Sequence, residues 1–264
     1  MFHKSSFLRK KLDIFFKKSI FAPMKISEYI AKQIKRILED TTFGYEQLKI
    51  DKAKYVTAAK ALERLIKKGV IKKVSKGTFY KPKTTVFGEL KPNEQELLRP
   101  YLFKNGKRIA YITGAALYNQ LGLTTQMAFR IKIASRHKRI YISTGAIKAT
   151  PVKSYADVTD NNYELLGFLD AMKDLKIIPD CNPNTAVTIL YGKIKKMKEE
   201  QIKEIIQYAL LYPPRVRALL GAILEQLNRK KEIKKLKDSL NPLSQFKLGV
   251  KEKILSTAAD WNIK

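Results

Sequence analysis

The side chains with the clearest chemical use in this sequence are lysines, and the chemistry they suit is phosphate binding. Residues 65–82 read LIKKGVIKKVSKGTFYKP, with six lysines among a few apolar residues and two glycines. Three more lysines lie upstream, in DKAKYVTAAK at residues 51–60. Clustered ammonium groups neutralise phosphates and release condensed counterions. These stretches therefore predict a surface that binds a polyanion, with nucleic acid as the first candidate and an anionic membrane as the second.

Side chains suited to catalysis are few. His137 lies in the basic context SRHKR, and the sequence contains no metalloprotease, phosphate-loop or serine-hydrolase motif. Several carboxylates do gather in one region, at Asp157, Asp160, Asp170, Asp174 and Asp180. Such a set is able to hold Mg²⁺, but helix caps and surface pairs explain it as well. We predict no metal, no cofactor and no enzymatic activity, and keep an enzyme acting on nucleic acid or nucleotide as a third hypothesis.

Three predicted helices precede the lysine-rich stretch. The first begins near Ser27, and its apolar face carries Ile30, Ile34, Ile37 and Leu38. The segment TTFGYEQLKI at residues 41–50 predicts a turn and a short second helix that carries Phe43 and Leu48. Asp51 is suited to cap a third helix, which Gly69 ends. The core face of this third helix is predicted to carry Val56, Ala59, Leu62, Leu65 and Ile66.

A β-hairpin follows the third helix. Residues 70–74 and 78–81 predict two strands around a tight turn that needs Gly77, and Pro82 closes the second strand. Three helices followed by a hairpin is the winged-helix arrangement, so residues 25–83 form a predicted first domain.

A winged helix brings the early residues of its third helix to the major groove and its hairpin to the DNA backbone. The predicted DNA-binding side chains of the helix are Lys52, Lys54, Tyr55, Thr57, Ala58 and Lys60. Those of the hairpin and the residues after it are Lys76, Thr78, Lys81 and Lys83. Tyr55 and Thr57 are the predicted source of sequence specificity. The alternative is that the helix lysines are only solvated.

The rest of the chain predicts a larger α+β domain. Residues 84–95 contain Pro and Gly and form a predicted linker, and residues 96–264 form the second domain. Short strands are expected at 108–112, 129–134, 139–143 and 146–152, in a small mixed or antiparallel sheet. Helices are expected at 94–102, 114–121, 162–174, 185–197, 198–211 and 214–238. The predicted fold class is therefore α+β, with an N-terminal winged helix and a helical C-terminal part.

The overall composition agrees with a nucleic-acid partner. The 264-residue chain has a net charge of +29, and residues 1–83 hold 22 of its 53 basic side chains but 7 of its 24 acidic ones. A lysine-rich proteome would also make such a surface basic. The single cysteine, Cys181, favours a reducing cytoplasm, and no stretch is long and apolar enough to span a membrane. Residues 1–24 form a basic extension, interpreted as an amphipathic helix, a flexible arm or a product of initiation ahead of Met24.

Four segments together resemble the AbiEi-like antitoxins and regulators of type IV toxin–antitoxin systems. They are the hairpin end KGTFYKP, ITGAALYNQLGLTTQ at 112–126, LLGFLDAMKDLKIIPD at 165–180 and YPPRVRALLGAILE at 212–225. The resemblance implies a protein that binds operator repeats and represses its own operon. It also implies that residues 93–264 counteract a nucleotidyltransferase-like toxin. In this class the antitoxin opposes the toxin's effect and does not necessarily bind the toxin.

Within that second region the basic candidates for antitoxin activity are Arg130, Lys132, Arg136, Lys138, Arg139, Arg215 and Arg217. Two alternatives stay open. One is a regulator without a toxin, and the other is an RNA-binding module built on the basic strands at residues 129–142, in which Arg and Lys alternate with apolar residues.

Overall fold

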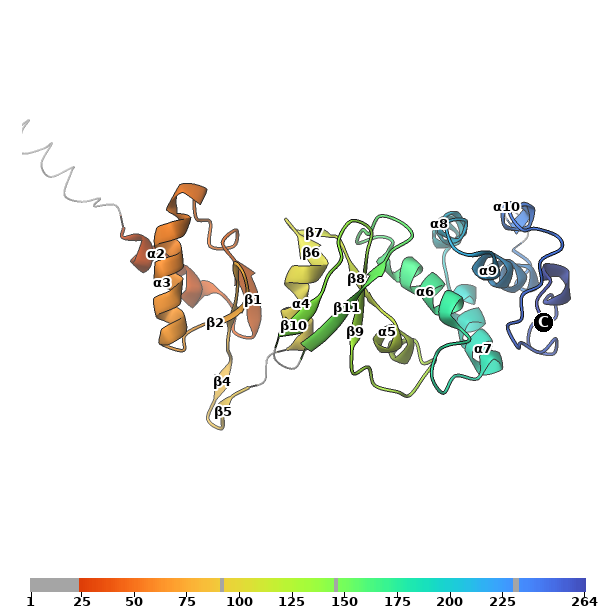
Figure 1. The fold of residues 1–264 in the computed structure, drawn as a ribbon, viewed down its shortest axis with the longest axis horizontal. Coiled ribbons are helices and arrows are strands. Elements are labelled where there is room, and N and C mark those ends of the chain that lie inside the picture. Colours follow the sequence, from red (N-terminus) through yellow and green to blue (C-terminus); the bar gives the residue numbers. More distant parts are fainter. Residues whose placement is uncertain (1–23, 91–92, 145–146, 230–232) are drawn as a thin grey trace, which may run out of the picture. The chain divides into compact units, whose positions relative to one another are not determined.

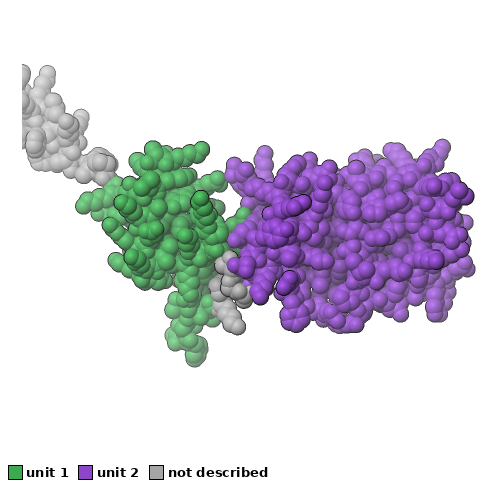
Figure 2. Space-filling view, in the orientation of Figure 1, with its two compact units in different colours: residues 1–100 green, residues 101–264 purple. Residues whose placement is uncertain are grey.

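The computed structural model describes residues 24–90, 93–144, 147–229 and 233–264. These residues form two compact units that divide between Pro100 and Tyr101 (Figure 2). The predicted basic extension at residues 1–24 lies outside the described residues except for Met24, which is half exposed. Together the units confirm an α+β protein with small sheets (Figure 1).

The first unit pairs helices with a three-stranded antiparallel sheet of order β1-β3-β2. Its elements in chain order are α2 (Ile26–Arg36), β1 (Thr41–Gly44), the 3-10 turn η1 (Lys52–Lys54), α3 (Tyr55–Lys67), β2 (Lys72–Ser75) and β3 (Thr78–Lys81). The core lies between helices and sheet, where Ile30, Ile34, Phe43, Leu48, Leu62, Ile71 and Phe79 are buried. Burial of these apolar side chains is the main force holding the unit together.

The prediction of a second helix at residues 41–50 is wrong. Residues 41–44 form β1, in which Phe43 lies opposite Phe79, and residues 45–49 form turns. Two threonines and a phenylalanine favour a strand, and the partner strand β3 supplies the hydrogen bonds. Leu38 is 77% exposed because α2 ends at Arg36, before the helix could carry it into the core.

The predicted core face of α3 is confirmed at Leu62, Leu65 and Ile66, which belong to the core cluster, and is wrong near the start of the helix. Ala58, Ala61 and Leu62 are buried, whereas Val56 is 74% exposed. The prediction took Val56 as a core position because it is apolar, but Ala58 and Ala61 are the side chains that face the core in this part of the helix. The predicted end of this helix is confirmed: Gly69 has φ +71°, and its N–H donates to the Ile66 carbonyl at 2.9 Å.

Two hairpins follow α3. The first joins β2 to β3 through Gly77, whose φ of +77° confirms the predicted tight turn. The predicted linker contains the second, formed by β4 (Thr84–Thr85) and β5 (Gly88–Glu89). At its tip Val86 is 94% exposed and Phe87 97% exposed. The helix α4 (Glu94–Leu102) then confirms the prediction for residues 94–102, with the Asn93 side chain accepting a hydrogen bond from the Gln95 N–H at 2.9 Å.

The second unit is built on a four-stranded mixed sheet of order β10-β11-β9-β8. After the small pair β6 (Phe103–Lys104) and β7 (Lys107–Arg108) come β8 (Tyr111–Thr113), α5 (Ala115–Gln120), β9 (Ile131–Ser135), β10 (Ile142–Thr144) and β11 (Ile147–Lys153). β9 and β11 are parallel, and the other neighbours are antiparallel. The predicted strands at 129–134, 139–143 and 146–152 are confirmed within a few residues.

Helices complete the second unit, and α5 and α6 contact the sheet (Figure 1). They are α6 (Tyr163–Asp174), α7 (Pro183–Lys195), α8 (Glu199–Ala209), α9 (Pro214–Gln226), α10 (Ile233–Asp238) and the 3-10 turn η2 (Ala259–Trp261). The single helix predicted at 214–238 is wrong, because α9 ends at Gln226 and α10 starts at Ile233. Trp261, 1% exposed, packs into this helical core. Of the helices in the described ranges, none has the length and apolarity to cross a membrane.

Candidate nucleic-acid interface

The outer face of α3 is a basic helix surface of the first unit. It consists of Val56, Thr57, Lys60, Glu63, Arg64, Lys67 and Lys68, all exposed. These residues lie opposite the buried Ala58, Ala61 and Leu62, as the 3.6-residue period requires. Four of the seven are basic and one is acidic. This face therefore presents a net positive charge and a few uncharged side chains that can contact bases.

The structure retains some of the predicted helix contacts and removes others. Lys52, Lys54, Thr57 and Lys60 are exposed. Ala58 is fully buried, so its assignment to the DNA side is wrong: one residue of helix rotation turns it into the core.

Tyr55, predicted to read sequence, is partly buried. Its ring stacks on Tyr45 with 4.6 Å between ring centroids, and Tyr45 in turn meets Phe79 edge to face. Burial raises the pKa of Tyr45, with a smaller contribution from the charge of Glu63. Packing therefore occupies much of the Tyr55 side chain, and Thr57 is the more accessible of the two residues predicted to give specificity.

Four exposed residues of the outer face were missed, namely Val56, Arg64, Lys67 and Lys68. A helical projection centred on the alanines Ala58 and Ala61 would have placed them on the solvent side. The predicted core face included Val56 and Ala59 beside Leu62, Leu65 and Ile66, because Val is more hydrophobic than Ala. The exposed methyl groups of Val56 are suited to contact with a thymine methyl.

The β2–β3 hairpin contributes less free charge than its sequence suggests. Lys76 at the tip and Lys83 after β3 are exposed, and Thr78 is partly buried. Lys81 has a different role, because its ammonium donates to the Ile37 carbonyl at 2.6 Å and lies 3.4 Å from the Lys35 carbonyl. Its assignment to phosphate is therefore corrected: it caps the C-terminal end of α2, where unpaired carbonyls and the helix dipole favour a cation.

A partly buried hydrogen bond joins β3 to the loop after α2. The Tyr80 hydroxyl donates to Asp40 Oδ1 at 2.6 Å, and the Asn93 backbone N–H donates to the same oxygen at 3.2 Å. These bonds, the one from Tyr80 foremost, lower the pKa of Asp40. Burial, and to a smaller extent the neighbouring Asp40, raise the pKa of Tyr80. The hairpin is thus held at its base while its tip, with Lys76, extends into solvent.

The basic candidates of the second unit do not form one cluster. Arg130, Lys132, Arg136, Lys138 and Arg139 are exposed along β9 and the residues next to it, whereas Arg215 and Arg217 belong to α9. Arg136 donates to the Ser154 and Tyr155 carbonyls, and Arg217 donates to the Ser239 carbonyl at 2.8 Å. Arg215 Nε likewise donates to the Lys173 carbonyl at 3.0 Å. These three arginines hold backbone segments in place, whereas no hydrogen bond within the described residues occupies Arg130, Lys132, Lys138 or Arg139.

Each carboxylate near residues 157–180 has a partner of its own, and Asp170 and Asp174 also share Lys173. Asp170, 2% exposed, accepts hydrogen bonds from the hydroxyls of Tyr111, Thr113 and Tyr212 at 2.9, 2.8 and 3.2 Å. Burial raises the pKa of Asp170, an effect that the charge of Lys173 opposes. Asp174 accepts from Tyr118 at 2.6 Å. The remaining three pair with His137 (Asp157), Arg108 (Asp160) and Gln126 (Asp180).

The described part of the chain holds no group of three or more His, Cys, Asp or Glu side chains arranged for a metal ion. Cys181 is partly buried, which raises the pKa of its thiol. Sequence spacing placed the aspartates near one another, but it could not reveal the tyrosines that surround Asp170, which come from β8 and from the turn before α9.

Comparison with known proteins gives limited matches. Residues 25–153 match the model of DUF6088, a family of unknown function. This match covers just under half of the chain. The crystal structure of the RV2827C protein from Mycobacterium tuberculosis aligns over 82% of either chain, at 13% sequence identity and a TM-score of 0.40, which is too low to carry an argument. A comparison with curated proteins found no significant match.

Proposed function

We propose that the protein is a duplex-DNA-binding regulator whose first unit acts as a winged helix. The observation that carries this proposal is the outer face of α3, where four basic side chains share an exposed helix face with Thr57 and Val56. The exposed Lys76 lies at the tip of a hairpin that follows the same helix. A helix carrying both cations and small uncharged side chains suits the major groove, where phosphates give affinity and base edges give specificity.

Each part of this surface has a distinct task. Lys60, Arg64 and Lys67 neutralise phosphates on either side of the groove, and Thr57 and Val56 meet base edges and thymine methyl groups. Lys76 and Lys83 bind the backbone beyond the groove. The hairpin therefore supplies affinity that depends on salt, and the first turns of α3 supply the choice of sequence.

For the whole chain we propose a non-enzymatic antitoxin of a type IV toxin–antitoxin system that represses its own operon. The support is the set of four sequence segments that resemble this class. In the structure one of these segments forms most of α6 and the turns after it, and another forms the turn before α9 and most of α9. The Tyr212 hydroxyl joins them by donating to the Leu166 carbonyl at 3.0 Å. In this proposal the second unit counteracts a nucleotidyltransferase-like toxin.

The experiment is a mobility-shift titration of the full chain against the duplex upstream of its own gene, at about 150 mM salt. A scrambled duplex of equal length and a structured RNA are the competitors. The proposal expects the upstream duplex to bind at least tenfold more tightly than either competitor. Equal binding of the two duplexes would contradict sequence-specific recognition.

RNA binding is the second candidate function, and one observation favours it. Around the basic residues 130–139, Met127 is 85% exposed, Phe129 99% and Tyr141 68%. Exposed aromatic rings among arginines and lysines are suited to stacking on unpaired bases. Preference for the RNA in the same titration would favour this second function over the first.

A further inference from the structure

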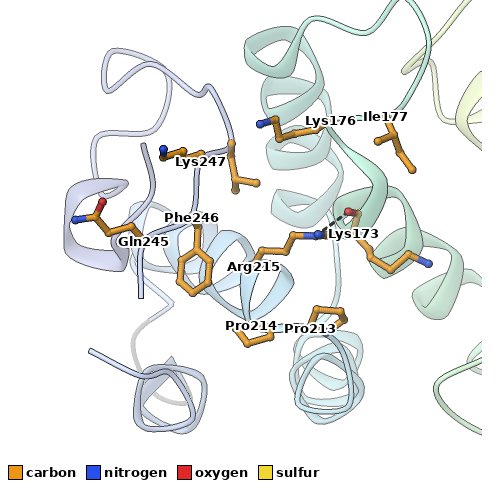
Figure 3. Close-up of a pocket in the computed structure, with 10 residues that line it drawn as sticks. Lys173, Lys176, Ile177, Pro213, Pro214, Arg215, Gln245, Phe246 and Lys247 are labelled. Carbon is orange, nitrogen blue, oxygen red and sulfur yellow. Dashed lines mark hydrogen bonds between the residues drawn. The ribbon is translucent and has the colours of Figure 1, made fainter. Parts of the chain in front are cut away.

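The second unit contains a basic pocket that the proposed DNA interface does not use. The pocket has a volume of about 440 Å³ and lies between the end of α6, the start of α9 and residues 245–248 (Figure 3). Pockets of roughly 300–1,000 Å³ are the size in which proteins bind small molecules. Its size therefore fits an organic ligand better than a single ion.

Hydrogen bonds fix the walls of this pocket. Arg215 Nε donates to the Lys173 carbonyl at 3.0 Å and so ties α9 to α6, as Figure 3 shows. On the opposite wall the N–H of Leu248 donates to the Lys264 carbonyl at 2.7 Å, and the N–H of Phe246 donates to the Asn262 carbonyl at 2.8 Å. The pocket is thus formed before any ligand enters, which lowers the entropic cost of binding.

The charge of the pocket is positive. Lys176, Arg215 and Lys247 line it from three different segments, and no Asp or Glu is among its lining residues. Lys173 also lines it, but its ammonium points away in Figure 3 and lies 3.4 Å from Asp170 and 3.7 Å from Asp174. Because α9 begins at Pro214, the positive end of its dipole adds to the field. These features select an anion.

Apolar side chains complete the lining. Phe246 presents its ring in the pocket, and Ile177, which is 70% exposed, lines the pocket from the opposite side in Figure 3. The Gln245 side chain adds an amide that can donate and accept. A free inorganic anion would need only the cations, whereas an aromatic ring and an exposed isoleucine offer a surface for a planar ring.

We propose that this pocket binds a phosphate-bearing small molecule with a planar ring, of the size of a nucleotide. Lys176, Arg215 and Lys247 bind the phosphate oxygens, and the ring packs on Phe246. The binding is non-covalent. It does not depend on the DNA interface, because all of these residues belong to the second unit.

The test is calorimetric titration of the full chain with ADP, AMP, pyrophosphate and adenosine. The proposal expects ADP to bind at least tenfold more tightly than adenosine, since adenosine has no phosphate. The double variant Lys176→Gln, Lys247→Gln should lose at least tenfold in ADP affinity. Both lysines are exposed, so this variant should fold normally.

A charge-matched control separates the pocket from the general basicity of the chain. Lys203 on α8 and Lys234 on α10 are exposed and lie outside the pocket lining. The control Lys203→Gln, Lys234→Gln should keep its ADP affinity within twofold. An equal loss in both double variants, or no binding of ADP and AMP, would overturn the proposal.

The role of the ring is tested with Phe246→Leu. This variant should weaken ADP severalfold and leave pyrophosphate unchanged, because pyrophosphate has no ring. Equal affinity for ADP and pyrophosphate in the unaltered protein would overturn the ring-binding part. Binding of a single-stranded oligonucleotide that depends on Lys176 and Lys247, without binding of ADP, would overturn the small-molecule assignment.

Discussion

At the residue scale, side chains of the same type serve different ends according to what surrounds them. Lys76 and Lys81 are five residues apart, yet Lys76 is free in solvent and Lys81 caps a helix. Asp170, a candidate for metal binding by its sequence context, is enclosed by three hydroxyl groups. Residue type predicts which chemistry is possible, and the neighbours decide which is used.

The capping role of Lys81 predicts a local loss of stability in Lys81→Met. Because a hydrogen bond from a charged donor to the Ile37 carbonyl disappears, the end of α2 should lose about 1 kcal/mol. Hydrogen exchange of the peptide that spans residues 33–37 should be about fivefold faster. Lys76→Met is the matched control, and it should leave this exchange unchanged but weaken DNA binding more than Lys81→Met. Identical exchange in the two variants would exclude the cap.

The buried Asp170 predicts a pH dependence of stability. Its pKa in the folded state is raised, so its contribution to the unfolding free energy is complete below the unfolded pKa of about 3.9 and is lost as pH rises through the folded pKa. Asp170→Asn cannot titrate. The unfolding free energy of the unaltered protein minus that of Asp170→Asn should therefore fall as pH rises, by at most about 1.4 kcal/mol per pH unit.

The measurement for Asp170 is denaturant unfolding followed by the fluorescence of Trp261, the single tryptophan, which reports on the second unit. Titrations start near pH 4 and proceed upward, because a raised carboxylate pKa lies above the ordinary value of about 3.9. A difference that grows with pH would mean that the pKa of Asp170 is lowered in the folded state, contrary to the effect of its burial.

At the element scale, most helices and strands follow from periodicity, and the failures have physical causes. The end of α3 at Gly69 and the turn at Gly77 were predicted because both need a positive φ. β1 was missed because a four-residue strand has too few residues for a clear period, and its partner β3 lies about 35 residues along the chain. The burial of Ala58 and Ala61 in α3 was missed because alanine is only weakly hydrophobic, and its small side chain allows a close approach between elements.

The packing of α9 predicts contrasting effects for two helical glycines. A Cβ at Gly221 would lie 2.2 Å from two ring atoms of the buried Trp261, whereas a Cβ at Gly192 in α7 would meet nothing within 4 Å. Gly221→Ala should therefore lower the unfolding free energy by about 3 kcal/mol. Gly192→Ala should raise it by about 0.8 kcal/mol, because alanine is the better helix former.

Circular dichroism during denaturant unfolding is the suitable probe for these two variants, because Gly221→Ala would disturb the tryptophan itself. If Gly221→Ala were as stable as the unaltered protein, the assigned position of Trp261 against α9 would be wrong.

At the scale of the whole molecule, the net charge predicts the kind of partner, and the structure separates the surfaces that are candidates for binding it. A net charge of +29 predicts a polyanionic partner, but it does not say which surface is responsible. The structure distinguishes the outer face of α3, the strip near residues 130–139 and the pocket at the start of α9. Sequence reasoning found part of the first two. It named Arg215 but not the pocket, since that site joins segments about 30 to 70 residues apart.

The most direct test of the central claim is the affinity of a charge-reversed first unit for the upstream duplex. In the full chain, Lys60→Glu with Lys76→Glu changes one cation on the outer face of α3 and one at the hairpin tip. The control, Lys203→Glu with Lys234→Glu, changes the net charge equally in the second unit. Binding is measured by fluorescence anisotropy over a range of salt concentrations.

The account predicts that the first-unit variant loses at least 30-fold in affinity at about 150 mM salt. The slope of log affinity against log salt concentration should become less negative by about 1.8, the value for two lost phosphate contacts. The control should stay within threefold of the unaltered protein. Equal losses in the two variants, or an unchanged salt slope for Lys60→Glu with Lys76→Glu, would contradict the assignment of DNA binding to α3 and its hairpin.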